Sequence, residues 1–304
     1  MKPDLSVEIA GVKFSNPVLT ASGTCGYGEE LADLFDLGRL GGIVTKSVTV
    51  QPRDGHPPPR TAETESGMLN AIGLANVGID KFIEEKLSFL ESYRTNVIVN
   101  VAGARLREYI EICSRLNDCL RADMVELNFS CPNVEWGMEI AKDALIAEKS
   151  VAAVKKVFSR PVIAKLSPNV SDIVLIARAC EAGGADGLSL INTLVGMAVD
   201  IETYRPRLTN NTGGLSGPAI KPVALALIYQ VYREVKIPII GIGGIMNYAD
   251  AVEFLLCGAT AVQVGTGLFV KPDIPLEIIS GLQKYLGKHK LKSVTDLVGK
   301  LRKY

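Results

Sequence analysis

The segment 128–133, Asn-Phe-Ser-Cys-Pro-Asn, combines a thiol with two side-chain amides directly behind the largely apolar run 124–127. Such a run predicts a buried strand, and α/β enzymes carry their reactive groups where strands end. Cys131 could act there as a base or a nucleophile, while Asn128 and Asn133 could hydrogen-bond a planar polar ligand. A free cysteine usually packs as a small hydrophobic residue, but these polar neighbours favour chemistry. The segment therefore indicates an enzyme that acts on a small, amide-rich molecule.

Few other side chains could perform acid–base chemistry. The sequence has two histidines, His56 in a Pro-rich segment and His289 in the basic tail. Its six cysteines include no CxxC pair, which argues against a zinc ribbon, an iron–sulfur cluster and a redox disulfide motif, so we expect no metal site. Elimination leaves Cys131 or a lysine as the reactive group.

The charge balance bears on the partners. Lys plus Arg equals Asp plus Glu at 33 each, so no overall positive field exists to attract nucleic acid or an anionic membrane. Residues 1–14 contain no continuous hydrophobic segment of the kind found in secretory signals or membrane spans. We therefore expect a cytoplasmic enzyme with a small-molecule substrate, and neither a nucleic acid nor a membrane as partner.

Eight short apolar runs alternate with eight segments whose apolar residues recur at helical spacing. The expected strands are residues 17–21, 42–46, 96–100, 123–128, 161–165, 187–191, 238–241 and 261–264. The expected helices are residues 29–37, 79–93, 106–117, 142–158, 170–182, 223–235, 248–257 and 274–286. A doubly wound open sheet would produce the same local pattern, but eight alternations favour an α/β fold of the (β/α)8 TIM-barrel type.

Additions to this barrel are also predicted. Val7–Ile9 and Val12–Phe14 alternate in polarity around Ala10-Gly11, which predicts an N-terminal β-hairpin at the bottom of the barrel. The basic end of the chain, residues 284–304, has apolar residues spaced as in an amphipathic surface helix.

Two long insertions follow the second and sixth expected strands, at residues 47–78 and 192–217. Both leave the carboxyl ends of strands, where barrel enzymes carry lids and specificity loops, so we expect both to cover the active site. No repeat, low-complexity tract or Gly/Ser linker divides the chain, which predicts a single domain over residues 1–304.

Two Gly-rich segments follow the last two expected strands, Gly241-Ile242-Gly243-Gly244-Ile245 and Gly265-Thr266-Gly267. Glycine permits positive φ and close backbone approach, and amide groups before a helix favour an anion. One such turn is weak support, but a pair on consecutive final strands predicts the phosphate site of a barrel enzyme. No GxGxxG follows an early strand, so a Rossmann-type NAD site is not supported.

Polar residues end most of the expected strands, namely Ser22-Gly23, Lys46-Ser47, Asn100, Asn128, Lys165 and Asn192-Thr193. A lysine at a strand end is more often solvated or ion-paired than functional, but two lysines facing one pocket are harder to explain in that way. A lysine beside an isoalloxazine ring would stabilise the charge of a reduced flavin, and carboxamides would recognise its pyrimidine edge. With the phosphate site, this pattern predicts FMN.

With these residues in place, the sequence resembles the dihydroorotate dehydrogenase family, in particular its class 1B catalytic subunits, nearly from end to end. The likeness is carried by 128–133, Asn16-Pro17, Ala21-Ser22-Gly23, Thr45-Lys46-Ser47, the run 66–74 (Ser-Gly-Met-Leu-Asn-Ala-Ile-Gly-Leu), Asn192-Thr193, the run 213–218 (Gly-Gly-Leu-Ser-Gly-Pro) and both Gly-rich segments. The resemblance implies an FMN-dependent (β/α)8 barrel that oxidises (S)-dihydroorotate to orotate in pyrimidine biosynthesis.

The resemblance also implies roles for single residues. Cys131 would be the catalytic base, removing the C5 proton of the substrate while a hydride leaves C6 for the flavin. The substrate positions are Lys46, Asn70, Ala71, Ile72, Gly73, Leu74, Asn128, Asn133, Asn192 and Thr193. The flavin positions are Ser22, Gly23, Lys46, Ser47, Asn100, Asn128, Lys165, Ile191, Gly217, Gly243, Gly244, Gly265 and Thr266. The run 134–139, Val-Glu-Trp-Gly-Met-Glu, departs from the Gly-rich pattern of the family.

For class 1B the resemblance implies reoxidation by NAD through an electron-transfer subunit that carries FAD and a 2Fe-2S cluster, in a heterotetramer of two catalytic and two electron-transfer subunits. Class 1A enzymes, which pass electrons to fumarate, are the alternative within the family. Other FMN-dependent dihydropyrimidine or dihydrouridine oxidoreductases share the cofactor and the cysteine. Two readings from different classes are a barrel aldolase with a Schiff base at Lys165 and a flavin scaffold without catalysis of its own.

Overall fold

Eight parallel strands close into a barrel in the computed structural model, which describes residues 2–129 and 140–302. The strands follow one another around the barrel in chain order: β3 (Val18–Thr20), β4 (Gly42–Val44), β7 (Asn96–Val101), β8 (Met124–Asn128), β9 (Val162–Lys165), β10 (Gly187–Leu190), β15 (Ile239–Ile242) and β16 (Ala261–Val264). These are the eight expected strands, with ends that differ by at most two residues. The (β/α)8 TIM barrel is therefore confirmed.

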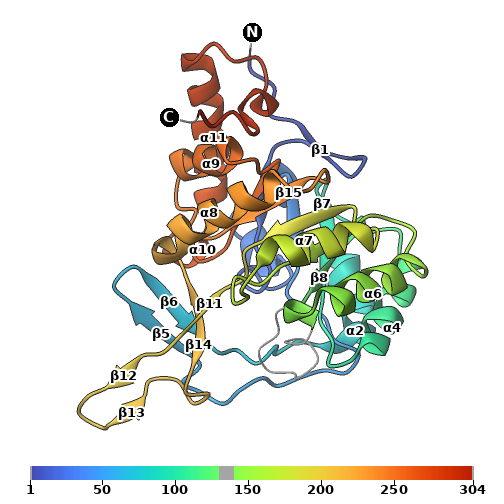
Figure 1. The fold of residues 1–304 in the computed structure, drawn as a ribbon, viewed down its shortest axis with the longest axis vertical. Helices are drawn as coiled ribbons and strands as arrows, with labels where there is room; N and C mark the ends of the chain where they lie inside the picture. Colours follow the sequence, from blue (N-terminus) through green and yellow to red (C-terminus); the bar gives the residue numbers. More distant parts are fainter. Residues whose placement is uncertain (1, 130–139, 303–304) are drawn as a thin grey trace.

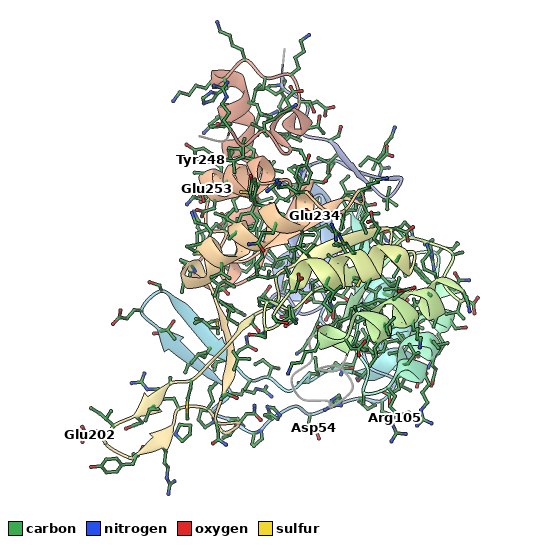
Figure 2. The ribbon with its side chains drawn as sticks, in the orientation of Figure 1. Asp54, Arg105, Glu202, Glu234, Tyr248 and Glu253 are labelled. Atoms are coloured by element: carbon green, nitrogen blue, oxygen red, sulfur yellow. The ribbon has the colours of Figure 1, made fainter. Side chains whose placement is uncertain are left out.

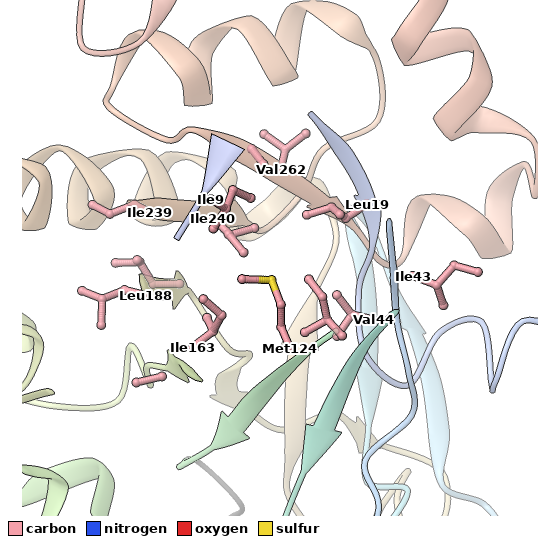
Figure 3. Packing of buried hydrophobic residues seen from close by; sticks show 14 of the residues in the cluster. Ile9, Leu19, Ile43, Val44, Met124, Ile163, Leu188, Ile239, Ile240 and Val262 are labelled. Carbon is pink, nitrogen blue, oxygen red and sulfur yellow. The ribbon is translucent and has the colours of Figure 1, made fainter. Parts of the chain in front are cut away.

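The barrel strands are mainly apolar because both of their faces are buried, although a few buried positions such as Asn100, Glu126 and Gln263 are polar. One face packs against the helices, and the other fills the barrel with branched side chains. Figure 3 shows Met124, Ile240 and Val262 in this cluster together with Ile9 of the N-terminal segment.

The N-terminal hairpin is confirmed and pairs β1 (Val7–Ile9) with β2 (Val12–Phe14). Its two turn residues, Ala10 (φ 52°) and Gly11 (φ 80°), both have the left-handed backbone that a tight two-residue hairpin requires. Ile9 is completely buried in the barrel cluster, so the hairpin closes the bottom of the barrel as expected.

Helices surround the barrel (Figure 1). They are α1 (Glu29–Ala32), α2 (Gly78–Lys81), η2 (Phe82–Leu87, a π-helical turn), α3 (Ser88–Leu90), α4 (Leu106–Asn117), α6 (Ala144–Lys155), α7 (Ile173–Ala182), α8 (Lys221–Tyr232), α9 (Tyr248–Leu256), α10 (Gly267–Val270) and α11 (Ile274–Lys288), with 3-10 turns η1 (Leu37–Arg39), η3 (Pro218–Ile220) and η4 (Val294–Leu297). None of the helices in the described part of the chain is both long and apolar enough to cross a membrane.

Several helix boundaries differ from expectation for local reasons. α6 and α7 begin later than predicted because Asp143 and Asp172 accept hydrogen bonds from the first backbone amides of these helices. The helix expected over 29–37 ends at Ala32, and the side chain of Asp36 instead starts the turn η1 by accepting from the amide of Gly38.

The two insertions form one antiparallel sheet over the carboxyl end of the barrel. Its order is β11-β14-β6-β5, with β5 (Thr61–Thr64) and β6 (Gly67–Asn70) from the first insertion and β11 (Leu194–Gly196) and β14 (Gly213–Ser216) from the second. A small second core of Leu69, Ala71 and Leu208 supports this sheet. The short pair β12 (Val199–Asp200) and β13 (Arg205–Pro206) extends from it as an arm, with Glu202 at its tip (Figure 2).

The C-terminal segment does not form the predicted surface helix. α11 ends at Lys288, and the chain then forms η4, which is capped by Ser293 and Asp296. Val294 and Leu297 are buried, so these apolar residues belong to the core and not to the face of an exposed helix. The large core cluster extends from Leu5 to Leu297. This extent agrees with the single-domain interpretation, which remains a prediction.

Candidate active site

A pocket of about 310 Å³ opens at the carboxyl ends of the barrel strands, under the sheet formed by the insertions. Parallel strands bring their carboxyl ends to one rim, so residues that are far apart in the sequence meet there. The predicted residues that line it are Ser22, Gly23, Lys46, Ser47, Asn70, Ala71, Ile72, Gly73, Leu74, Asn128, Lys165, Ile191, Asn192, Thr193, Gly217, Gly243, Gly244, Gly265 and Thr266.

Among the predicted residues that the structure describes, Asn100 is not part of this lining. The side chain of Asn100 is completely buried behind the wall of the pocket, where it contacts Ser47, so its direct role at a cofactor stays a prediction. Cys131 and Asn133 lie outside the described residues. The predicted base therefore rests on its motif, which begins at the described residue Asn128 at the end of β8.

Lys165 places a positive charge at the floor of the pocket. Its side chain is 5% exposed, and its Nζ lies 2.9 Å from Ser22 Oγ and 3.5 Å from Glu126 Oε1. A buried charge is costly unless it is paired and hydrogen-bonded, and these two contacts supply both. An ammonium group has three N–H donors, and the described residues accept from it at two positions. Lys165 can therefore also donate to a ligand in the pocket.

Glu126 was not identified from the sequence as a functional residue. It lies in β8 with no exposed surface and accepts hydrogen bonds of 2.7 Å from Asn100, Ser189 and Gln263. A signal was present, because Glu126 is the single charged residue in the run 124–127. An acidic residue in a buried strand needs specific partners, but local patterns do not reveal which residues supply them.

A chain of hydrogen-bonded side chains leads from Glu126, through Asn100, to the pocket. The hydroxyl of Ser47 donates to Asn100 Oδ1, Asn128 Nδ2 donates to Ser47 Oγ at 3.4 Å, and Asn192 Nδ2 donates to Asn128 Oδ1 at 3.2 Å. The backbone amide of Thr193 then donates to Asn192 Oδ1 at 2.8 Å. These bonds hold the amides of several strands in one arrangement, as recognition of a planar ligand requires.

Lys46 supplies a second positive charge, on the wall of the pocket. Burial lowers the pKa of Lys46, the nearby positive charge of Arg60 acts in the same direction, and Glu30 opposes them. An anionic group of a ligand would favour the charged form of this lysine. Lys46 could therefore bind a carboxylate.

The Gly-rich loops form a cradle at one end of the pocket. Gly217, Gly243 and Gly244 all have positive φ, at 96°, 133° and 71°. A Cβ atom on Gly244 would lie 2.7 Å from the carbonyl oxygen of Gly217, and one on Gly243 would lie 2.9 Å from Ala224 Cβ. Only glycine fits these positions, so the loop backbone itself lines this end of the pocket, as the cradle of a phosphate group requires.

The sequence suggested that amides at the start of helix α9 would contribute to this cradle, but they do not. Asn247 Oδ1 accepts from the amides of Ala249 and Asp250, and Asp250 accepts from the amides of Met246 and Asn247. This capping box occupies the amides that would otherwise attract an anion. A phosphate group would therefore be held by the loops themselves.

Asn169 and Ser216 are among the lining residues that sequence reasoning missed. Asn169 donates to the carbonyl of Thr193 at 2.9 Å and accepts from the amide of Val195 at 3.0 Å, which fixes the start of the second insertion. Ser216 accepts from Thr266 Oγ1. Ser216 lies within the motif 213–218, but the motif alone does not reveal this contact with the final loop.

Comparisons with known proteins agree with the geometry of the pocket. The family model described as dihydroorotate dehydrogenase matches residues 4–286. Similar proteins named dihydroorotate dehydrogenase B (NAD(+)), catalytic subunit, occur in Citrifermentans bemidjiense (54% identical, 99% of this chain and 99% of that protein), Geobacter sulfurreducens (53%, 99% and 99%) and Bacteroides thetaiotaomicron (49%, 98% and 99%). The similarity spans the barrel and both insertions.

Proposed function

Since the chain belongs to the dihydroorotate dehydrogenase family, we propose that it oxidises (S)-dihydroorotate to orotate in pyrimidine biosynthesis, with FMN as its cofactor. One observation carries the proposal. A single pocket collects two lysines, Lys46 and Lys165, three side-chain amides, Asn70, Asn128 and Asn192, and a glycine cradle. A flavin phosphate, a flavin ring and an acidic pyrimidine ring together require these three kinds of group.

The family is flavin-dependent, and the pocket suits FMN in particular. The loops at Gly243-Gly244 and Gly265-Thr266 would hold the phosphate, and Lys165 would donate to the pyrimidine edge of the ring. When bound, the flavin supplies the acceptor for a hydride. The remaining steps depend on how this chain orients the substrate and moves a proton.

The substrate carboxylate is assigned to Lys46, whose charged form such an anion favours. Asn70, Asn128 and Asn192 bind the ring amides, which need one donor and one acceptor for each N–H and C=O pair. Cys131 is the base that removes the C5 proton, as the resemblance to the family implies, while the hydride leaves C6. Asn133 completes the predicted amide set.

The relatives are named as catalytic subunits of NAD(+) enzymes, which supports NAD as the final acceptor and a partner subunit. We assign reoxidation to a partner subunit that carries FAD and a 2Fe-2S cluster, in a heterotetramer of two catalytic and two electron-transfer subunits, located in the cytoplasm. Fumarate is the alternative acceptor.

The Schiff-base alternative is disfavoured by two contacts of Lys165. A lysine that attacks a carbonyl must be neutral, whereas Lys165 is close to Glu126 Oε1 and donates to Ser22 Oγ. Both contacts use the amine as a hydrogen-bond donor, which fits the binding role assigned to Lys165.

The proposal is tested with the purified chain under anaerobic conditions. A yellow protein whose flavin absorbance is bleached by dihydroorotate is expected, whereas dihydrouracil, which lacks the carboxylate, should bleach it far more slowly. Adding NAD and fumarate separately to the reduced protein then identifies the acceptor, and recovery of the colour by neither would indicate a missing electron-transfer subunit. A protein that binds no flavin, or whose flavin ignores dihydroorotate, would contradict the proposal.

A further inference from the structure

Glu126 lies at the centre of the buried polar network and contacts neither the pocket nor solvent. Asn100 Nδ2 and Lys165 Nζ face its Oε1 at 2.7 and 3.5 Å, and Ser189 Oγ and Gln263 Nε2 face its Oε2, both at 2.7 Å. Each of these four groups is a hydrogen-bond donor to Glu126. Glu126 therefore acts as a pure acceptor, as an ionised carboxylate does.

The orientation of Gln263 shows how strongly this acceptor acts. Gln263 gives its Nε2 to Glu126, and its own buried Oε1 has no hydrogen-bond partner among the described residues. A buried unpaired carbonyl is unfavourable, so the hydrogen bond that Gln263 donates to Glu126 must stabilise the fold by more than this cost.

On one side, Glu126 controls a charge in the pocket. Lys165 is the cation in contact with it, and Lys165 also lines the pocket. The carboxylate both holds this ammonium and offsets its field. The positive potential that a bound flavin experiences therefore depends on both residues.

On the other side, Glu126 determines which way the amides point. Because Glu126 accepts, Asn100 must present its NH2 group to it and turn its oxygen to Ser47. Ser47 then donates to Asn100 and accepts from Asn128, whose oxygen accepts from Asn192. Each side chain fixes the donor and acceptor of the next, and the last ones line the pocket.

From this arrangement we propose that Glu126 is a positioning residue that sets the redox potential of the bound flavin through Lys165 and the orientation of the substrate-facing amides through Asn100. The inference rests on the proposed function and deepens it. Glu126 itself touches neither cofactor nor substrate in this assignment.

The test compares two variants of the FMN-loaded full chain, E126Q and D123N. Asp123 directly precedes the same strand and also forms an ion pair, with Arg121 at 3.1 Å, but at the amino end of the barrel. Each substitution removes one carboxylate charge at nearly constant shape. The midpoint potential of the flavin is measured by anaerobic titration with redox dyes, and orotate affinity is measured from the change in the flavin spectrum.

In E126Q the charge of Lys165 is no longer offset, so the reduced flavin is favoured. The ratio of the affinities for reduced and oxidised flavin should rise at least tenfold, a positive shift of about 30 mV or more for a two-electron couple. Orotate affinity should fall on the order of tenfold, because one polar contact in the amide chain is reversed. D123N should change neither quantity.

An E126Q potential equal to that of the wild type, or more negative, would overturn the cofactor side of the proposal. Unchanged orotate affinity in E126Q would overturn the substrate side. Equal shifts in D123N would also count against the proposal, because they would indicate a general effect of net charge.

Melting temperatures of the flavin-free protein test the inference separately from the proposed function. If E126Q alone fails to fold, the double variant E126Q/K165Q should fold and approach the wild-type melting temperature, since no charge is left unpaired. Failure of the double variant as well would overturn the inference. A wild-type protein that binds no FMN would instead contradict the proposed function, and the apo-protein melting comparison would still decide the pairing of Glu126 with Lys165.

Discussion

Thr266 Oγ1 donates a hydrogen bond of 2.8 Å to Ser216 Oγ, and this contact joins the loop after the last barrel strand to the end of β14 in the second insertion. Both residues line the pocket. The bond spans fifty residues of sequence and connects the predicted phosphate loop to the sheet above it. The cradle and the cover of the pocket are therefore parts of one connected structure.

The first prediction concerns the base. Replacing Cys131 with alanine should leave FMN bound, but the rate of flavin reduction by dihydroorotate should fall by roughly 10²-fold or more, as expected for loss of a positioned general base. Anaerobic stopped-flow absorbance measures this rate. The control is C119A, since Cys119 lies outside the pocket lining and its Sγ contacts the carbonyl of Arg115. Reduction of C131A at the wild-type rate would remove Cys131 from the mechanism.

The second prediction concerns the charge of Lys46. Because burial lowers the pKa of Lys46, this lysine should lose its proton, and orotate should lose affinity, at a lower pH than an ordinary lysine with a pKa of 10.5 would produce. K46M should weaken orotate binding by roughly tenfold to a hundredfold and abolish this part of the pH dependence. Orotate titrations between about pH 7 and 11 measure both effects.

The sign for stability follows from the same shift. The unfolded chain binds the Lys46 proton more tightly than the folded chain, so the apo protein should gain stability as pH rises through the lowered pKa.

The exposed Lys81, which pairs with Glu85 on the surface, offers K81M as a control that should leave orotate binding unchanged. Identical pH profiles of orotate affinity for K46M and the wild type would contradict the assignment of the substrate carboxylate to Lys46.

The third prediction concerns the glycine cradle. A Cβ on Gly244 would lie 2.7 Å from the carbonyl oxygen of Gly217, at a backbone φ of 71° that alanine adopts poorly. G244A should therefore lose flavin occupancy and cost roughly 1–3 kcal/mol of stability. Gly287, where a Cβ would meet no atom within 4 Å, provides the control, because alanine there should be neutral or stabilise α11. Flavin absorbance per protein and thermal melting distinguish the two, and normal flavin content in G244A would argue against the cradle.

The fourth prediction concerns the C-terminal segment. Leu297 is 5% exposed in the core, whereas Leu301 is 46% exposed. L297A should reduce the free energy of unfolding by about 2–4 kcal/mol, and L301A by less than about 1 kcal/mol. Urea denaturation measures both. Equal, small losses would favour the amphipathic surface helix that the sequence suggested.

Much of the barrel could be predicted because its signals are local. A strand buried on both faces is mainly apolar, and a covering helix repeats its apolar residues at helical spacing. The rim residues Lys46, Asn128 and Lys165 could also be placed, since carboxyl ends of parallel strands converge. The prediction of a surface helix for the C-terminal segment was wrong, because apolar residues at helical spacing do not reveal whether they face solvent or the core. Val294 and Leu297 are buried.

The sequence by itself therefore determined the eight strands, the positions of the two insertions and most of the residues that line the pocket. Only the tertiary structure decided that the insertions pair in one sheet, that Asn100 lies behind the wall and that Glu126 joins Lys165 to the amide chain. Strand patterns show whether a side chain is buried, whereas its partners come from strands as distant as β16, where Gln263 lies 137 residues from Glu126. Such pairings depend on how the barrel closes, and no local pattern encodes that geometry.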